Sequence, residues 1–247
     1  MRTGLIALTV AACVASFAAN ADPKKDPVDF TGVWWPARGT ADFKPDPVLT
    51  PEAQKTWDQV RSSMAKGVVP EDSTAACVPP GTPRLMTRVY PIQWIRYDKG
   101  YVLIHEYENM LRWFYMDGRK APTGDDLLPT FNGYSVAHWE DDALVVETTG
   151  LKPQSDSGLQ VWIQMGVKVT PQLKLVERYR LGPEGKTMEV QLTMTDPDIL
   201  AKPWVAKKVF ELRPNVEIME FTCLPDENVV TYKADGSTTF KDLQQPK

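Results

Sequence analysis

Short apolar runs separated by turn residues fill the chain from residue 91 to residue 223. Several alternate apolar and polar residues with the period of two that is typical of β-strands. Pairs of runs flank Asp98-Lys99-Gly100, Asp141-Asp142, Pro183-Glu184-Gly185 and Pro214-Asn215, and we expect each pair to form a hairpin. With a first strand near 30–35, the pattern predicts about ten strands: 92–97, 101–108, 111–116, 134–140, 143–149, 172–181, 188–195, 207–212 and 216–223.

One segment has the period of a helix instead. Thr50 can accept a capping hydrogen bond, Pro51 suits the first helical position, and Gly67 follows the last turn. The helix predicted over 51–66 has one apolar face, made of Ala53, Trp57, Val60 and Met64. We expect the helix to pack through that face as a lid or flank.

These elements predict an all-β, mainly antiparallel fold, either a lipocalin-like up-and-down β-barrel or a strongly curved sheet, with one flanking helix. Strands that are apolar on both faces, as at 102–104 and 144–146, are covered outside or line an apolar interior. Gly32-Val33-Trp34 on the first strand resembles the Gly-x-Trp that lipocalins carry near their start. We expect a single barrel-like domain over 30–223, with a mobile lead-in at 22–29 and a polar tail at 224–247.

The first 21 residues have the features of a secretory signal peptide. Arg2 gives a positive start, 4–19 is apolar but too short to span a bilayer, and Ala19-Asn20-Ala21 provides small residues for cleavage before Asp22. We therefore expect a periplasmic or secreted protein without a membrane span. A lipoprotein anchored at Cys13 is the minor alternative, because 10–13 loosely resembles a lipidation site.

Cleavage would leave two cysteines, Cys77 and Cys223. In an oxidising compartment an even pair favours a disulfide, and we expect these two residues to be bonded. Two buried free thiols are the alternative.

The charge balance excludes some partners. A formal net charge of −4 disfavours nucleic acid, because binding phosphates requires a basic face. The sequence has no phosphate-binding loop, dinucleotide glycine motif or paired Cys-x-x-Cys, so we expect no cofactor. Its two histidines lack the spacing of a metal site, and we expect no metal.

Several distinctive motifs are spread over most of the chain. They are Phe30-Thr31-Gly32-Val33-Trp34, Leu49-Thr50-Pro51-Glu52-Ala53, Cys77-Val78-Pro79-Pro80-Gly81-Thr82-Pro83-Arg84, Tyr115-Met116-Asp117-Gly118-Arg119, Trp139-Glu140-Asp141-Asp142-Ala143-Leu144-Val145-Val146-Glu147-Thr148, Val176-Glu177-Arg178-Tyr179 and Asp196-Pro197. Together they resemble an uncharacterised family of exported bacterial β-rich proteins. The resemblance implies export and a β-rich fold. It implies no particular activity.

Charged residues interrupt the apolar faces of several predicted strands. A buried, unpaired charge is costly, so these groups either pair inside or point to water. One interpretation is Glu–Arg pairing that fixes barrel closure, and the other is a cavity floor that orients the polar end of an apolar ligand. Together with nearby aromatic residues, the candidate ligand-binding positions are Trp94, Tyr107, Trp113, Tyr115, Asp117, Trp139, Glu177, Arg178, Trp204 and Glu220.

A smaller set of residues has side chains suited to acid–base chemistry. Histidine titrates near neutral pH and can move a proton, while an arginine can stabilise developing negative charge. The candidate catalytic residues are His105, Glu106, Arg112 and His138.

Three functions are compatible with these observations. The first is binding of an apolar or aromatic small molecule in an internal cavity with a Glu/Arg polar anchor, which needs no reactive group. The second is a cofactor-independent lyase, isomerase or hydrolase that uses His/Glu acid–base chemistry in the same cavity. The third is an envelope interaction module with a fully packed interior.

Overall fold

The structure is a computed structural model that describes residues 26–37, 42–68, 72–224, 230–232 and 238–240. The predicted signal peptide at 1–21, the alternative lipidation site at Cys13 and the start of the predicted lead-in at 22–25 lie outside the described residues. So does most of the predicted tail at 224–247.

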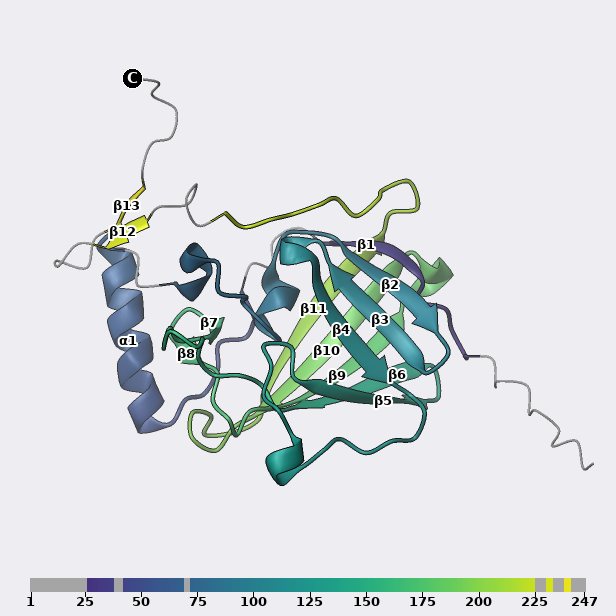
Figure 1. The fold of residues 1–247 in the computed structure, drawn as a ribbon, viewed down its shortest axis with the longest axis horizontal. Coiled ribbons are helices and arrows are strands. Elements are labelled where there is room, and N and C mark those ends of the chain that lie inside the picture. The colour runs from purple at the N-terminus through teal and green to yellow at the C-terminus, as the bar shows by residue number, and fades with distance from the viewer. Residues whose placement is uncertain (1–25, 38–41, 69–71, 225–229, 233–237, 241–247) are drawn as a thin grey trace, which may run out of the picture.

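In the described part of the chain, nine strands close into one barrel (Figure 1). Their order around the barrel is β1-β11-β10-β9-β6-β5-β4-β3-β2, and β1 closes it by pairing with both β2 and β11. The prediction of an all-β barrel with one flanking helix is confirmed. The strands are β1 (Gly32–Pro36), β2 (Ile92–Tyr97), β3 (Gly100–His105), β4 (Met110–Tyr115), β5 (Tyr134–Glu140), β6 (Ala143–Thr149), β9 (Lys174–Leu181), β10 (Thr187–Thr195) and β11 (Trp204–Leu212).

The predicted hairpins β2–β3, β5–β6 and β9–β10 are confirmed, but the fourth is wrong. Residues 213–224 contain no strand. A strand has two edges, and β11 uses one for β10 and the other for β1, where Trp34 lies opposite Leu212. Barrel closure therefore leaves no free edge to which 216–223 could pair.

One strand pair departs from the up-and-down pattern. β4 and β5 run parallel, whereas every other neighbouring pair in the barrel is antiparallel. The chain leaves β4 at Tyr115 and returns through 116–133 to the barrel end at which β4 began. A parallel pair requires such a long crossover in place of a tight turn.

The helix α1 (Pro51–Ala65) forms where the sequence predicts it. Thr50 Oγ1 accepts from the Ala53 amide at 3.4 Å and caps the first turn. Val60 is buried and Trp57 packs against the core, while Met64 at the end of the same face is exposed. Figure 1 shows α1 and the short pair β7 (Trp162–Gln164) and β8 (Val167–Lys168) beside one end of the barrel.

The opposite end of the barrel is filled by the segment that precedes β1. The Phe30 ring is fully buried and lies 5.2 Å from Trp94 and 5.8 Å from Trp139, measured between ring centroids. Asp26 accepts hydrogen bonds from Arg96, from the Tyr101 hydroxyl and from Trp139 Nε1. These contacts hold the described part of the segment that the sequence analysis treats as a mobile lead-in.

Cys77 and Cys223 form the predicted disulfide, with their Cα atoms 5.6 Å apart across a sequence separation of 146 residues. Farther along the tail, β12 (Val230–Tyr232) and β13 (Thr238–Phe240) pair as a separate two-stranded sheet. Among the described residues, no helix is both long enough and apolar enough to cross a membrane.

Candidate functional site

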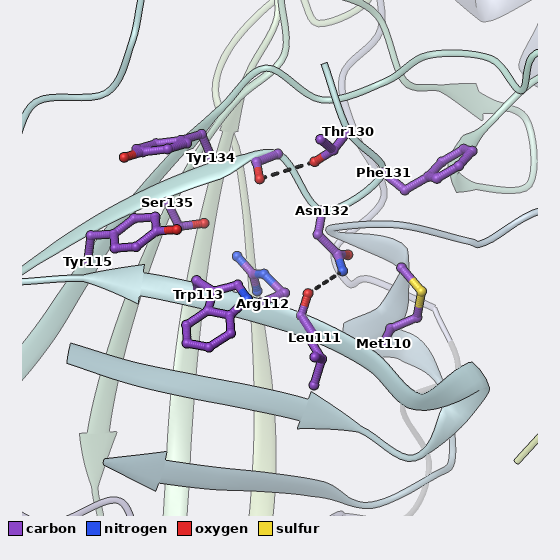
Figure 2. Close-up of a pocket in the computed structure, with 11 residues that line it drawn as sticks. Met110, Leu111, Arg112, Trp113, Tyr115, Thr130, Phe131, Asn132, Tyr134 and Ser135 are labelled. Atoms are coloured by element: carbon purple, nitrogen blue, oxygen red, sulfur yellow. Dashed lines mark hydrogen bonds between the residues drawn. The ribbon is translucent and has the colours of Figure 1, made fainter. Parts of the chain in front are cut away.

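The parallel pair β4–β5 leaves a seam in the barrel wall. The two strands pair only where Phe114 lies opposite Ser135 and Tyr115 lies opposite Val136. Toward the start of β4 and β5 the two strands are no longer paired. There Asn132 Nδ2 donates to the Leu111 carbonyl at 2.9 Å, in place of a ladder hydrogen bond. A pocket of about 340 Å³ opens at this place, which we call the seam pocket (Figure 2).

Aromatic side chains form much of the wall of the seam pocket. Tyr115 and Tyr134 stack with ring centroids 5.0 Å apart, and the Arg119 guanidinium lies 4.0 Å from the Tyr115 ring. Figure 2 shows these two rings on one side, Phe131 on the other and Arg112 between them. The pocket therefore combines flat apolar surfaces with one buried cation.

That cation belongs to a polar network inside the barrel. Arg112 donates to both carboxylate oxygens of Glu177, at 3.0 and 2.6 Å, and the two side chains are 1% and 0% exposed. Tyr179 donates its hydroxyl proton to Glu177 at 2.8 Å. Arg112 also donates to Thr148 Oγ1 at 3.3 Å, and that hydroxyl lies 2.8 Å from Ser135 Oγ. The network ties together strands on opposite sides of the seam.

The network sets the charge states of its members. Burial alone would lower the pKa of Arg112, but the negative charge of Glu177 and the Tyr179 hydroxyl reverse this, and the net pKa is raised. Burial, and then the Glu177 charge, raise the pKa of Tyr179 well above its usual value. At neutral pH Arg112 is therefore a cation and Tyr179 a neutral donor.

Several nitrogens of the barrel interior are buried without a hydrogen-bond partner among the described residues, and they include Arg112 Nε, His105 Nε2 and Trp94 Nε1. Burial, followed by the positive charge of Arg112, lowers the pKa of His105 to about 3. His105 is therefore neutral at any physiological pH. Because buried donors normally have partners, Arg112 Nε marks a place where an acceptor is favoured.

The other predicted catalytic residues lie apart from this site. Glu106 follows His105 but accepts from the Met219 amide at 2.9 Å, in the irregular segment 213–224 that follows β11. His138 is exposed on the outer face of β5, where Glu140 lies 3.1 Å away. Among the predicted catalytic set, only His105 and Arg112 face the same interior.

The predicted ligand-binding residues divide into four groups. Trp113, Tyr115 and Glu177 belong to the seam pocket or to the network behind it, and Asp117 lies beside the pocket through its ion pair with Arg119. The remaining groups lie elsewhere. Trp94, Trp139 and Trp204 pack in the core, Arg178 pairs with Glu140 outside, and Tyr107 and Glu220 lie toward the 213–224 segment.

Four residues of the site and its network were not predicted from the sequence: Asn132, Ser135, Thr148 and Tyr179. A signal for two of them was present, because the predicted hairpin at Asp141-Asp142 places Ser135 opposite Thr148. Two hydroxyl residues opposite each other on an otherwise apolar face indicate a polar partner nearby. The position of Asn132 depends on the loop before β5 and has no comparable signal.

Within the described residues, no group of three or more His, Cys, Asp or Glu side chains is arranged to hold a metal ion. Comparison of the sequence with protein-family models and with curated proteins found no match in either.

Proposed function

We propose that this protein binds a small molecule with an apolar or aromatic body in the seam pocket, with a hydrogen-bond acceptor of the ligand placed at Arg112. The observation that carries the proposal is the unpartnered Nε of the buried Arg112, whose other nitrogens already bind Glu177 and Thr148. A pocket of this kind, with apolar walls and few polar groups, is typical of small-molecule sites.

The ion pair also limits the kind of acceptor. Glu177 already balances the charge of Arg112 inside the barrel. A second carboxylate beside this pair would be desolvated without a new counter-charge, which is costly. A neutral acceptor, such as a carbonyl or ether oxygen, suits the site better. The aromatic walls favour a ring system as the body of the ligand.

The catalytic alternative has less support from the geometry. It requires an acid–base pair in one cavity. His105 is buried in the barrel interior, whereas the neighbouring Glu106 side chain binds the Met219 amide outside it. Ser135 lies against Thr148, and no histidine is among its hydrogen-bond partners in the described residues. Binding without turnover therefore fits better.

We also propose that the protein is exported to the periplasm or secreted. The Cys77–Cys223 bond supports this, since disulfides persist mainly in oxidising compartments. Isolating the protein from separated cell fractions and determining its N-terminal residue tests export and cleavage before Asp22 together.

The binding test uses the mature chain and the neutral aromatic probe N-phenyl-1-naphthylamine, whose fluorescence rises in apolar surroundings. Trp113 lines the seam pocket and is 45% exposed, while Trp35 is 40% exposed on β1 outside it. We expect Trp113→Ala to weaken probe binding several-fold and the matched control Trp35→Ala to leave it unchanged. Equal binding by both variants would overturn the proposal.

A second experiment identifies the ligand class. The mature protein is incubated with a small-molecule extract, and bound and free fractions are compared by mass spectrometry. Retention of an unchanged compound that Trp113→Ala fails to retain supports the binding function. Consumption of a compound with appearance of a matching product would replace it with the catalytic alternative.

A further inference from the structure

A second pocket, also of about 340 Å³, lies beside the end of the barrel where β3 ends. We call it the mouth pocket. It shares no lining residue with the seam pocket. Its walls come from the 3-10 turn η2 (Arg84–Thr87), the residues after it, the turn that follows β3, and β7. The side chains that matter for binding are Arg84, Arg88, Tyr90, Tyr107, Gln164 and Met165.

Gln164 presents a fixed hydrogen-bond donor to this pocket. Its side-chain Oε1 accepts from the Phe43 backbone amide at 3.0 Å. A backbone N–H can only donate, so this contact fixes which end of the amide is the oxygen. The residue is 3% exposed, and its Nε2 has no partner among the described residues. A buried amide donor of this kind favours an acceptor from outside the chain.

Arg88 provides two more donors. Its Nε and Nη2 are both buried and have no hydrogen-bond partner in the described part of the chain. These two N–H groups lie on one edge of the guanidinium, which is an edge that binds carboxylates through two parallel hydrogen bonds. The neighbouring Arg84 differs, because it donates to both oxygens of Asp72 at 2.8 and 2.6 Å.

The surroundings of Arg88 leave its charge without a close counter-ion. Burial, and then the positive charge of Arg84, lower the pKa of Arg88, while Tyr107, Asp72 and Glu108 act in the opposite direction without reversing the shift. No ion pair joins Arg88 to a carboxylate of the described residues. The guanidinium instead lies 5.0 Å from the Tyr107 ring. An anion bound at the Nε–Nη2 edge of Arg88 would therefore form charge-assisted hydrogen bonds with a guanidinium that is already shielded from water.

We propose that the mouth pocket is a second binding site, for a small carboxylate with an apolar or aromatic body. The carboxylate lies against the Nε–Nη2 edge of Arg88 and accepts a third hydrogen bond from Gln164 Nε2. The body of the ligand lies against Tyr90 and Tyr107, whose ring centroids are 5.3 Å apart.

Several features favour a carboxylate over a phosphate group. The pocket offers one free guanidinium edge and one amide donor, which match the two oxygens of a planar carboxylate. A phosphate has more oxygen atoms and more charge to satisfy, and the second arginine is already engaged by Asp72. Asp42, an exposed acid that also lines the pocket, adds repulsion that grows with ligand charge.

The test uses the mature chain and titrates benzoate by isothermal calorimetry, with benzamide as the neutral isostere and inorganic phosphate as the competing anion. Arg88→Lys keeps the positive charge but loses the two-donor edge. Gln164→Glu keeps the acceptor for the Phe43 amide and replaces the donor with an acceptor. We expect each variant to weaken benzoate binding by at least about tenfold. Arg180→Gln, which removes an exposed arginine paired with Asp142, serves as the control and leaves binding unchanged.

A measurement on the unaltered protein guards against variants that fail to fold. Nitrogen-15 spectra of arginine side chains report each Nε–H, and we expect the Nε–H signal assigned to Arg88 by through-bond correlation in the unaltered protein to shift as benzoate binds. Absence of that shift at millimolar benzoate overturns the proposal, as does equal binding of benzamide. Tighter, Arg88-dependent binding of inorganic phosphate would also overturn it and assign the pocket to phosphate.

Discussion

Arg112 and Glu177 form a doubly hydrogen-bonded ion pair through the barrel interior, although β5 and β6 separate their strands in the wall. Each side chain is nearly or fully buried. The pair therefore links β4 to β9 across the parallel β4–β5 contact. That contact is the shortest ladder between neighbouring strands of the described barrel. A buried pair of this kind adds little net stability, but breaking it leaves an uncompensated charge.

We predict that Glu177→Gln destabilises the protein strongly. The buried Arg112 cation would lose its counter-charge, and the free energy of unfolding should fall by roughly 3–5 kcal/mol. Urea unfolding measures the change. The double variant Arg112→Met/Glu177→Met removes both charges and should recover most of the loss, because methionine fills a similar volume. Glu140→Gln, in a surface pair, should change stability by about 1 kcal/mol or less. A similar small effect of Glu177→Gln would contradict the prediction.

Stability should fall as the solution is acidified, through His105. In the folded protein its pKa is lowered to about 3, whereas in the unfolded chain it returns to about 6.5. Between these values the unfolded state binds one more proton, so the stabilising contribution is present above pH 6.5 and is lost as pH falls toward 3.

The isosteric variant His105→Gln isolates this effect. Its urea unfolding free energy should change less between pH 7 and pH 4 than that of the original protein, because one proton-binding group is gone. Parallel pH profiles for the two proteins would show that the buried imidazole does not contribute. Carboxylates that titrate in the same range affect both proteins equally, so the difference between the profiles is the measurement.

The disulfide should contribute a large share of the stability. Its closed loop spans 146 residues, and the chain-entropy relation gives about 5 kcal/mol for a loop of this length. Cys77→Ala/Cys223→Ala should lower the denaturant midpoint accordingly. Phe221, which stacks on Tyr107 with ring centroids 4.8 Å apart, should then become accessible to limited proteolysis. Unchanged protection of 213–224 would show that packing alone holds this segment.

Asp26 should be important for sealing the end of the barrel filled by Phe30. Asp26→Ala removes the acceptor of three side-chain hydrogen bonds, from Arg96, Tyr101 and Trp139. We expect a loss of about 2–4 kcal/mol and a change in Trp139 fluorescence as its indole N–H loses its partner. Asp142→Ala removes an exposed carboxylate paired with Arg180 and should change stability by about 0.5 kcal/mol or less. Equal effects of the two substitutions would mean that the segment before β1 is not held by Asp26.

Local features of the sequence predicted much of the fold because they act over a few residues. Thr50 and Pro51 define the start of α1, and turn residues between alternating runs define the hairpins β2–β3, β5–β6 and β9–β10. Alternation along β3 also puts His105 on the same face as Tyr101 and Leu103, and all three are buried. The disulfide was predicted because only two cysteines, Cys77 and Cys223, remain after the predicted signal peptide.

Other features depended on which strands meet. The run at 216–223 has the composition of a strand, but β1 already pairs with the edge it would need. Tyr107–Asn109 ends β3 early, because Glu108 and Asn109 adopt positive φ and turn the chain. The first outcome cannot be derived from local pattern, since it depends on the closed sheet.

The sequence by itself therefore determined the strands of the barrel, the helix, the cysteine pair and the presence of charges on apolar faces. Only the tertiary structure decided how those charges are used. Alternation showed that Arg112 and Glu177 interrupt apolar runs, but their pairing requires β4 and β9 to face each other through the barrel. The seam pocket and the mouth pocket likewise arise where strands diverge or end, because a pocket depends on surfaces brought together by closure from distant parts of the chain.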